Sequence, residues 1–291
     1  MPSKFSYLKP KTLADTVHIL AESGPEAKIL AGGTDLLVGV RRRQYSFQEL
    51  LDIKGLPEVN RFDYTPGQGL LIGAAVTMNQ LAESVLVQER YPALAAAARS
   101  VASYQLRNRA TAVGNICNAS PGADLAPALL IFDAVVHIAR RQGQREVPLA
   151  DFFVGVKRTV LSPQELVTGI FLPDPGLGDR SIFLKQSRLK GHDLAIVNVA
   201  VRLTPQQKIC LAMGAVAPTP LRLAGLEELL DAGMPSKELA EKAAAEVKGM
   251  IKPISDVRAS AAYREHLAGV LVRRGLERVL AGGVNDHVRQ A

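Results

Sequence analysis

The sequence predicts an α+β protein of two domains, and three observations support this prediction. Residues 28–53 run from a strand signal through a Gly loop and a helix or turn to a second strand, which is the pattern of a parallel strand pair. Residues 173–178 (PDPGLG) hold two prolines and two glycines, so they favour neither a helix nor a central strand. Three strand-like runs and then three helical runs follow this boundary, and 291 residues are enough for about two domains.

The elements before the boundary follow from caps and periodicity. Residues 12–23 predict a helix with Thr12 as its N-cap, which ends at Gly24-Pro25. Thr77 is the predicted cap of a further helix, and residues 103–124 are expected to form a loop. The remaining strands expected in this part are at 28–31, 50–53, 70–74 and 165–172, with a hairpin of strands 135–139 and 146–148. A helix or turn is expected at about 34–43, and helices at about 78–84, 93–102 and 124–132.

After the boundary the pattern changes to an antiparallel sheet followed by helices. The strand-like runs lie at 181–187, 196–203 and 209–216, and the helical runs at about 223–232, 236–249 and 256–281. The sequence therefore predicts a C-terminal domain of a three-stranded antiparallel sheet with a helical bundle.

Composition limits the classes of partner. Hydrophobic residues make up 47% and charged residues 22% of the chain, which is the balance of a soluble globular protein. The formal net charge of +7 is scattered, and an aromatic content of 5% without Trp is too low for a base-stacking platform. We therefore expect no nucleic-acid partner. The densest basic run, Arg41-Arg42-Arg43, is interpreted as a solvated face or as a docking surface for an acidic partner.

The cysteines and histidines do not predict a metal site. Cys117 and Cys210 have no CxxC or Cys/His spacing, and the five histidines are isolated. No apolar run reaches the roughly 18 residues that a membrane span needs, and the first residues lack an apolar signal segment. The expectation is a cytoplasmic protein without a membrane span.

Two loops carry the functional signal. The first is AGGTDL at 31–36, and the second is GNICNASPGAD at 114–124. A Gly pair allows backbone N–H groups to approach an anion closely, and Asn, Ser and Asp side chains suit the hydroxyls of a ribose or ribityl chain. Each loop alone is also compatible with ordinary turn chemistry. Together they indicate a site for a large phosphate-bearing cofactor.

The chain resembles the FAD-binding medium subunit of the molybdenum hydroxylases, which include xanthine and carbon monoxide dehydrogenases. The resemblance spans nearly the whole chain. It implies a two-lobed FAD-binding domain (PCMH-type) at 1–175, with lobes at about 1–56 and 57–175, and a C-terminal domain at 176–291. Six segments in fitting order carry the resemblance: AGGTDL (31–36), QLRNRATAVGNICNASPGADLAPALL (105–130), ELVTGIFLP (165–173), FLKQSR (183–188), DLAIVNVAV (193–201) and GAVAPTPLRL (214–223).

Within this resemblance each cofactor contact has an expected place. Backbone N–H groups of residues 29–36 would wrap the FAD pyrophosphate, with Asp35 as either a cofactor contact or a helix cap. The second loop would face the phosphates and the ribityl and ribose hydroxyls, two apolar residues would touch a ring, and Lys185 would lie beside the isoalloxazine. The residues implied are Ile29, Leu30, Ala31, Gly32, Gly33, Thr34, Asp35, Leu36, Thr111, Gly114, Asn115, Asn118, Ser120, Asp124, Leu166, Val167 and Lys185. The family usually has two glycines where this chain has Val113-Gly114.

The resemblance implies an electron-transfer subunit of an oxidoreductase complex. A large partner subunit would hold molybdopterin, and a small one would hold two [2Fe–2S] clusters. Electrons would reach non-covalent FAD in this chain and leave to an acceptor such as NAD or a quinone. This role needs no acid–base pair or nucleophile, and the sequence shows none. The alternatives are a free-standing flavin-dependent oxidase or reductase and a nucleotide-binding module without redox activity.

Overall fold

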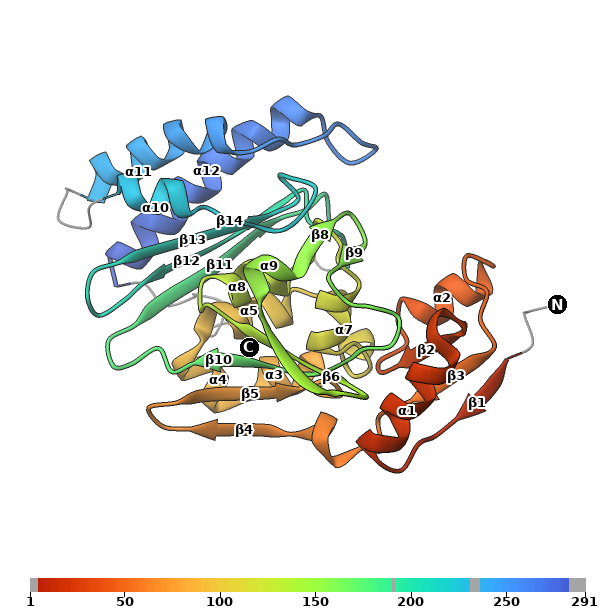
Figure 1. Cartoon of the computed structure of the whole chain (residues 1–291). Helices are drawn as coiled ribbons and strands as arrows, with labels where there is room; N and C mark the ends of the chain where they lie inside the picture. The colour runs from red at the N-terminus through yellow and green to blue at the C-terminus, as the bar shows by residue number, and fades with distance from the viewer. Residues whose placement is uncertain (1–4, 190–191, 231–235, 283–291) are drawn as a thin grey trace.

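The computed structural model of the chain describes residues 5–189, 192–230 and 236–282. These residues form an α+β fold, as the sequence predicts, and the described sheets contain three, five, four and two strands. Figure 1 shows helices between the five-stranded and four-stranded sheets, with the C-terminal helices beyond the latter. The three-stranded sheet lies to one side of these layers, so the fold has a separate N-terminal lobe.

The N-terminal lobe is a small parallel sheet of order β1-β3-β2. Its strands are β1 (Ser6–Leu8), β2 (Ala27–Leu30) and β3 (Glu49–Asp52), and its helices are α1 (Leu13–Ser23), η1 (Gly24–Glu26) and α2 (Leu36–Arg41). The predicted parallel pair and the predicted first helix are confirmed. The Thr12 hydroxyl oxygen accepts a hydrogen bond from the Asp15 N–H at 3.0 Å, which is the expected cap. Strand β1 is an addition, because three residues give too short a pattern to predict.

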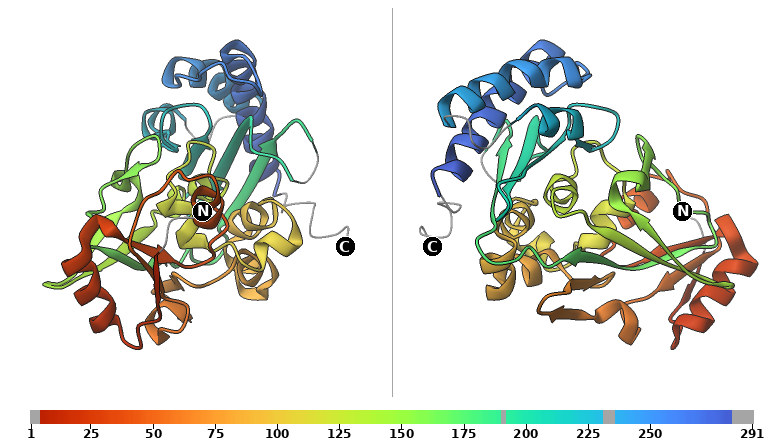
Figure 2. Two further views of the ribbon diagram at one scale, coloured as in Figure 1. Left: turned by 90° about the vertical axis from the view of Figure 1, so that its right-hand side faces the viewer. Right: turned by 60° about the vertical axis from the view of Figure 1, so that its left-hand side comes forward.

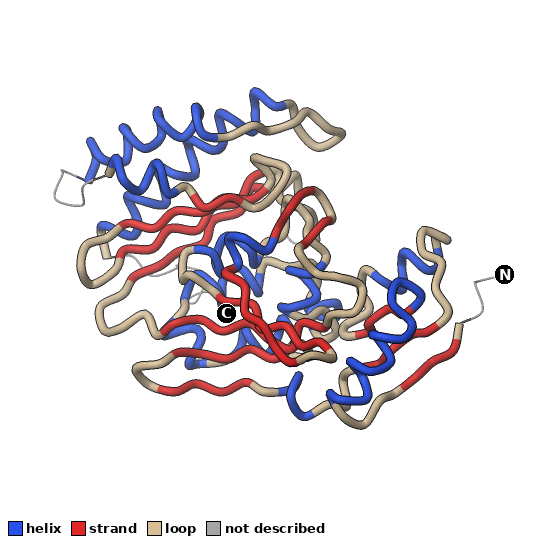
Figure 3. The backbone as a smooth tube through the Cα atoms, viewed as in Figure 1, coloured by secondary structure: helices blue, strands red, loops and turns tan. Residues whose placement is uncertain are grey.

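The second lobe is built on an antiparallel sheet of order β4-β5-β10-β6-β7. Its strands are β4 (Phe62–Thr65), β5 (Gly69–Gly73), β6 (Val135–Arg140), β7 (Gly143–Pro148) and β10 (Leu166–Pro173). The predicted hairpin is the β6–β7 pair, and β10 pairs on both of its sides. In Figure 3 the long strand β10 crosses the middle of this sheet, while short β8 (Phe153–Gly155) and β9 (Arg158–Thr159) form a separate ribbon.

Short helices lie in the segments that precede and connect these strands. They are η2 (Pro57–Asn60), α3 (Met78–Glu83), α4 (Val85–Arg90), α5 (Pro92–Arg99), α6 (Tyr104–Arg107), α7 (Ala112–Cys117), α8 (Leu125–Leu130) and α9 (Leu149–Phe152). Thr77 forms a capping box with Gln80 at the start of α3, as predicted. The prediction of a continuous loop at 103–124 is wrong, because Ser103 and Thr111 accept hydrogen bonds at the starts of α6 and α7.

The C-terminal sheet contains β11 (Arg180–Gln186), β12 (Val197–Leu203), β13 (Ile209–Gly214) and β14 (Leu221–Arg222) in that order. The three predicted strands are present, and β14 adds a fourth. The helices are α10 (Ala224–Leu229), α11 (Ser236–Glu246), η3 (Val247–Met250) and α12 (Ala261–Leu280). The predicted helix 223–232 extends past the described residues, which stop at 230 here. Helix α12 starts later than predicted because Ser260 is its N-cap.

Both faces of the C-terminal sheet are buried. Alternate residues of β13 point to opposite sides: Leu211 and Met213 pack with the C-terminal helices, whereas Cys210 and Ala212 join the core of the second lobe. Figure 2 (right) shows the C-terminal helices on one side of this sheet and the helices of the second lobe on the other. Because both faces are buried, the strands of this sheet are apolar at successive positions and do not alternate between apolar and polar residues. No helix in the described part of the chain is long and apolar enough to cross a membrane.

Candidate functional site

A cleft of about 1090 Å³ runs between the two predicted loops and extends to the C-terminal domain. Every predicted site residue lines this cleft except Leu30 and Lys185. The side chain of Leu30 is buried in a separate small cluster with Val40, Phe47 and Leu50 in the N-terminal lobe. The structure therefore brings residues from both loops and from β10 to one cavity, although more than 130 positions separate Ile29 from Val167 in the sequence.

The first loop offers a row of free backbone donors. Within the described residues, the N–H groups of residues 32–35 donate to no carbonyl or side-chain oxygen. Gly33 has a φ of 75°, a left-handed conformation that allows the chain to turn between β2 and α2. Consecutive free N–H groups around such a turn form a concave anion site. The geometry fits a phosphate group.

Gly32 is required for a different reason from the one that the sequence suggests. A Cβ atom there would lie 2.2 Å from the Arg109 carbonyl oxygen and 2.9 Å from its carbon. Both are backbone atoms of the segment that leads into the second loop, so they cannot move aside without separating the loops. At Gly33 an added Cβ would meet the side chains of Leu30 and Leu37, at 2.8 and 3.2 Å. The Gly pair thus serves loop packing and a left-handed turn.

The second loop begins with helix α7. Thr111 caps it by accepting from the Gly114 N–H at 3.0 Å. Val113, which replaces the family's usual glycine, has helical backbone and is buried in the core of the second lobe at 4% exposure. Val113 also lines the cleft, so its side chain forms part of the cavity wall. The Asn115 Oδ1 atom is buried and has no hydrogen-bond partner within the described residues, while Asn115 itself lines the cleft. An orphaned polar atom at this place fits a hydroxyl-bearing ligand.

Lys157 is a cleft residue that sequence reasoning missed. Its Nζ donates to the Asn118 Oδ1 at 2.8 Å, and its backbone N–H donates to the Ala119 carbonyl at 2.9 Å. Burial lowers the pKa of Lys157, and the nearby Asp35 carboxylate opposes that shift. Lys157 also has a φ of 59°. No local sequence signal marks it, because its place in the cleft depends on a contact between segments 38 residues apart.

Asp124 and Lys185 form a buried ion pair behind the cleft. The Lys185 Nζ lies 2.7 Å from the Asp124 Oδ2, and both side chains are less than 10% exposed. Asn198 donates from its Nδ2 to the other carboxylate oxygen at 3.0 Å, and Lys185 also donates to the Ser100 carbonyl at 3.1 Å. Burial raises the pKa of Asp124, although Lys185 and Asn198 oppose that shift. The ammonium group next to the cleft is therefore paired with a carboxylate.

The remaining predicted residues divide into polar and apolar walls. Ser120 lines the polar side, and Asp35 sits at the N-cap of α2 without a side-chain capping bond, so the cap interpretation is not supported. Leu166 and Val167 on β10 are 2% and 4% exposed and form the apolar wall. Cys117 also lines the cleft. Burial raises the pKa of its thiol to about 12, so the thiol stays neutral and is a weak nucleophile.

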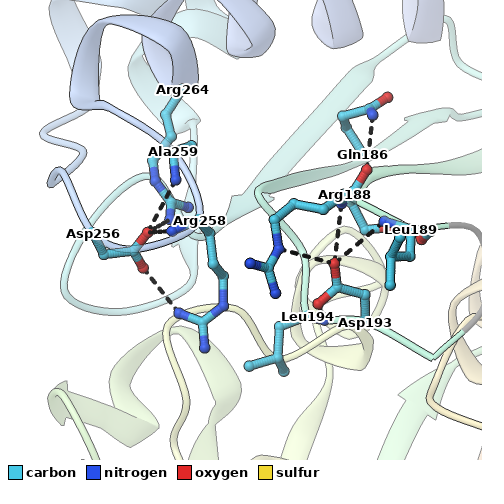
Figure 4. Close-up of polar contacts among 10 residues, drawn as sticks. Gln186, Arg188, Leu189, Asp193, Leu194, Asp256, Arg258, Ala259 and Arg264 are labelled. Carbon is cyan, nitrogen blue, oxygen red and sulfur yellow. Dashed lines mark hydrogen bonds and ion pairs between the residues drawn. The ribbon is translucent and has the colours of Figure 1, made fainter.

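The far wall of the cleft comes from the C-terminal domain. Figure 4 shows two Asp–Arg clusters there, one around Asp256 and one around Asp193. The Asp256 carboxylate accepts from the guanidinium groups of Arg258 and Arg264 at 2.9 and 2.8 Å. Asp193 accepts from the backbone N–H and the Nε of Arg188, at 3.1 and 3.4 Å. Lys252, Asp193, Asp256, Arg258 and Arg264 all line the cleft, and sequence reasoning placed none of them in the site.

The cleft and the free N–H groups fit a protein that binds a large phosphate-bearing cofactor between two small lobes. The comparisons with known proteins give that class a name. The FAD binding domain in molybdopterin dehydrogenase matches residues 3–175, and the CO dehydrogenase flavoprotein C-terminal domain matches residues 182–279. The chain belongs to the family of FAD-binding subunits of the molybdenum hydroxylases, which are oxidoreductases. The predicted family and the predicted cofactor, FAD, are thereby confirmed.

Relatives and solved structures agree over nearly the whole chain. The xanthine dehydrogenase FAD-binding subunit of Escherichia coli O157:H7 is 33% identical, over 95% of this chain and 96% of its own. The carbon monoxide dehydrogenase medium chain of Hydrogenophaga pseudoflava is 34% identical, over 95% and 97%. The solved carbon monoxide dehydrogenase of the same organism superposes with a TM-score of 0.91 at 33% identity, covering 97% of this chain and 99% of that one. The solved quinoline 2-oxidoreductase from Pseudomonas putida 86 superposes with a TM-score of 0.90 at 27% identity, covering 98% of this chain and 99% of that one.

Proposed function

We propose that this chain is the electron-transfer subunit of a three-subunit molybdenum hydroxylase. In this proposal a large partner subunit holds molybdopterin and a small one holds the [2Fe–2S] clusters. When bound here, FAD supplies electron transfer between those clusters and an acceptor such as NAD or a quinone. Names of relatives such as "medium chain" support the subunit role.

The observation that carries the proposal is the row of four free N–H groups at residues 32–35. These groups would hold the FAD pyrophosphate, and Lys157 would supply a counter-charge. Asn115, with its orphaned Oδ1, and Asn118 and Ser120 would hydrogen-bond hydroxyls of the ribityl and ribose chains.

The other predicted contacts have narrower roles. Leu166 and Val167 would pack on a ring of the cofactor, and Thr111 and Gly114 would shape the second loop by capping α7. Lys185 would hold the Asp124 carboxylate in position at the cleft, since the two side chains form an ion pair. We also propose a domain boundary at 175/176, within the segment in which Gly176 and Gly178 have φ values of 81° and 83°.

Purification of the chain tests the proposal. The isolated protein should be yellow, with absorbance maxima near roughly 370 and 450 nm, the range of flavins. Acid precipitation should release the flavin, because the proposed binding is non-covalent. A tagged chain should capture molybdenum- and iron-bearing subunits from its own cell extract. The isolated flavoprotein should not oxidise xanthine, aldehydes or N-heterocycles, and turnover on the order of 1–1000 per second would instead establish a free-standing oxidase.

A further inference from the structure

A turn at residues 100–102 joins α5 to α6 and forms part of the cleft wall. Val101 and Ala102 both line the cleft. Ala102 has a φ of 44°, a left-handed conformation that a residue with a side chain adopts only at a cost in free energy. No glycine stands at this position to relieve that cost, so the turn depends on contacts that hold it.

Two cations hold the carbonyl groups of this turn. Arg107 donates from its Nη1 to the Val101 carbonyl at 3.0 Å and to the Ala102 carbonyl at 3.2 Å. Lys185, which belongs to the C-terminal domain, donates to the Ser100 carbonyl at 3.1 Å. Three successive carbonyls are thus bound by charged donors, whose hydrogen bonds are about twice as strong as those of neutral groups.

Arg107 is itself held in place from behind. Its Nε donates to the Asn79 Oδ1 at 3.0 Å, and Asn79 is 4% exposed. The Asn79 Nδ2 donates in turn to the Tyr104 carbonyl at 3.0 Å and to the Asn108 Oδ1 at 2.7 Å. Among the described residues no carboxylate lies at ion-pair distance from Arg107. The guanidinium is therefore directed at the carbonyls of the turn and not at an acidic side chain.

The orientation of these carbonyls determines where a donor of the turn points. In a planar trans peptide unit the C=O and the N–H point in opposite directions. The Val101 carbonyl faces Arg107, so the Ala102 N–H of the same peptide unit points away from Arg107. This N–H donates to no described residue, and Ala102 lines the cleft. The turn therefore presents an unpaired donor beside Val101 to a ligand in the cleft.

We propose that Arg107 is a positioning residue for the cofactor: it holds the turn at 100–102 in the left-handed conformation in which Val101 and the Ala102 N–H meet bound FAD. The inference rests on the proposed function, because it requires FAD in this cleft. Arg107 does not line the cleft, so it acts through the turn and not by contact with the cofactor. A cation that served to attract the FAD phosphates would point into the cleft, whereas this guanidinium points to backbone carbonyls.

The test compares the FAD affinity of the folded full-length chain, measured by flavin fluorescence titration, with the stability of the FAD-free chain in urea. Arg107→Gln should weaken FAD binding by about tenfold or more, as expected when hydrogen bonds from a charged group are lost. Arg107→Lys should recover part of the affinity, because an ammonium group also donates to carbonyls. The loss in Arg107→Gln should persist at about 1 M salt, where exposed charges are screened beyond about 3 Å.

Arg109→Gln is the matched control for the change in charge. It removes the same charge two residues further along the chain. The Arg109 side chain is outside the cleft lining and has no hydrogen bond to any described residue. FAD affinity in Arg109→Gln should therefore stay close to that of the unaltered chain.

A glycine rescue tests the route through the turn. Glycine adopts a left-handed φ without the cost that alanine has. The double variant Arg107→Gln/Ala102→Gly should therefore bind FAD about fivefold more tightly than Arg107→Gln, as expected when the cost of one left-handed residue is relieved. A role of Arg107 in fold stability alone predicts no such recovery, because the affinity is measured on folded chains.

Three outcomes would overturn the proposal: equal FAD affinity in Arg107→Gln and Arg109→Gln, a loss that disappears at high salt, or no gain on adding Ala102→Gly. If Arg107→Gln does not fold, Arg107→Lys with and without Ala102→Gly gives the same comparison, because lysine keeps the charge. Failure of the unaltered chain to bind FAD would contradict the proposed function instead. The absorbance ratio of flavin to protein shows this before any variant is compared.

Discussion

Replacing Lys185 with Met should destabilise the FAD-free chain by about 3 kcal/mol, the lower end of the range for removing one partner of a buried ion pair. The Lys185 Nζ lies 2.7 Å from the Asp124 carboxylate, and the two side chains are 9% and 8% exposed. Without the ammonium group, the carboxylate stays buried with Asn198 as its remaining side-chain donor. The lower end applies because Asp124 also borders the cleft, through which water can reach it.

The destabilisation caused by Lys185→Met should depend on pH, and the direction follows from the Asp124 pKa. Burial already raises the pKa of Asp124. A carboxyl whose pKa is higher in the folded than in the unfolded chain favours the fold below the unfolded pKa, near about 4, and loses that contribution as the pH rises through its folded pKa. Loss of Lys185 raises the folded pKa further, so Lys185→Met should be less destabilising at pH 5 than at pH 8.

Urea unfolding followed by far-UV circular dichroism measures these differences, with tyrosine fluorescence as a second probe of two-state behaviour. Asp124→Asn and the double variant Asp124→Asn/Lys185→Met complete a double-mutant cycle. The double variant should be more stable than Lys185→Met, because it leaves no unpaired buried charge. A cost below about 1 kcal/mol for Lys185→Met, the value of an exposed pair, or simple additivity in the cycle, would refute the reasoning.

Three further predictions concern other parts of the fold. Gly32→Ala should lower the free energy of unfolding by about 1–3 kcal/mol and should also lower FAD affinity, because the added Cβ would lie 2.2 Å from a backbone oxygen. Urea and flavin titrations measure the two effects. Gly249→Ala is the control, because no atom lies within 4 Å of the Cβ added there. Asn115→Leu should weaken FAD by about 1–3 kcal/mol without destabilising the FAD-free chain, since it removes an unpaired buried oxygen; equal affinity would exclude Asn115 from the site. Asp174→Asn should remove the part of the folding free energy that depends on the Asp174 carboxylate being charged. Burial raises the Asp174 pKa, but donors such as the Gly67 N–H and the Arg90 guanidinium lower it to about 2. That contribution is present above about pH 4 and is lost as the pH falls toward about 2. Between these pH values the stability of Asp174→Asn should therefore change less with pH than the stability of the unaltered chain. Acid titration followed by circular dichroism measures the difference.

Sequence reasoning succeeded where the signal was local. The Thr12 and Thr77 caps, the β6–β7 hairpin and the strands β11, β12 and β13 each follow from residues within one segment. It also identified the part of the cleft formed by the two loops and by Leu166 and Val167, because the Gly-rich segments and a resemblance across the chain both pointed to it. The central position of β10 was not predicted, since pairing with β5 and β6 joins segments about 30 to 100 residues apart.

The site details that were missed depend on contacts between distant segments. Lys157 reaches the cleft through Asn118 and Ala119, and Asp124 is paired with Lys185 across 61 positions. Gly32 was expected to make room for a phosphate, whereas the structure shows that it makes room for the Arg109 carbonyl. Composition and spacing cannot show such contacts, because they identify residue types and not their partners in the fold.

The Gly32 contact implies that cofactor binding and lobe packing are coupled. The free N–H groups of residues 32–35 belong to the N-terminal lobe, and Asn115 and Asn118 belong to the second lobe. The Arg109 backbone lies against Gly32 where the two segments meet, so the donors of both loops face one cavity only when the lobes are packed. A ligand that bridges both loops binds the packed arrangement alone, and at 100 times its dissociation constant it stabilises that arrangement by about 2.7 kcal/mol. FAD should therefore raise the unfolding temperature of Gly249→Ala as much as that of the unaltered chain, and that of Gly32→Ala less.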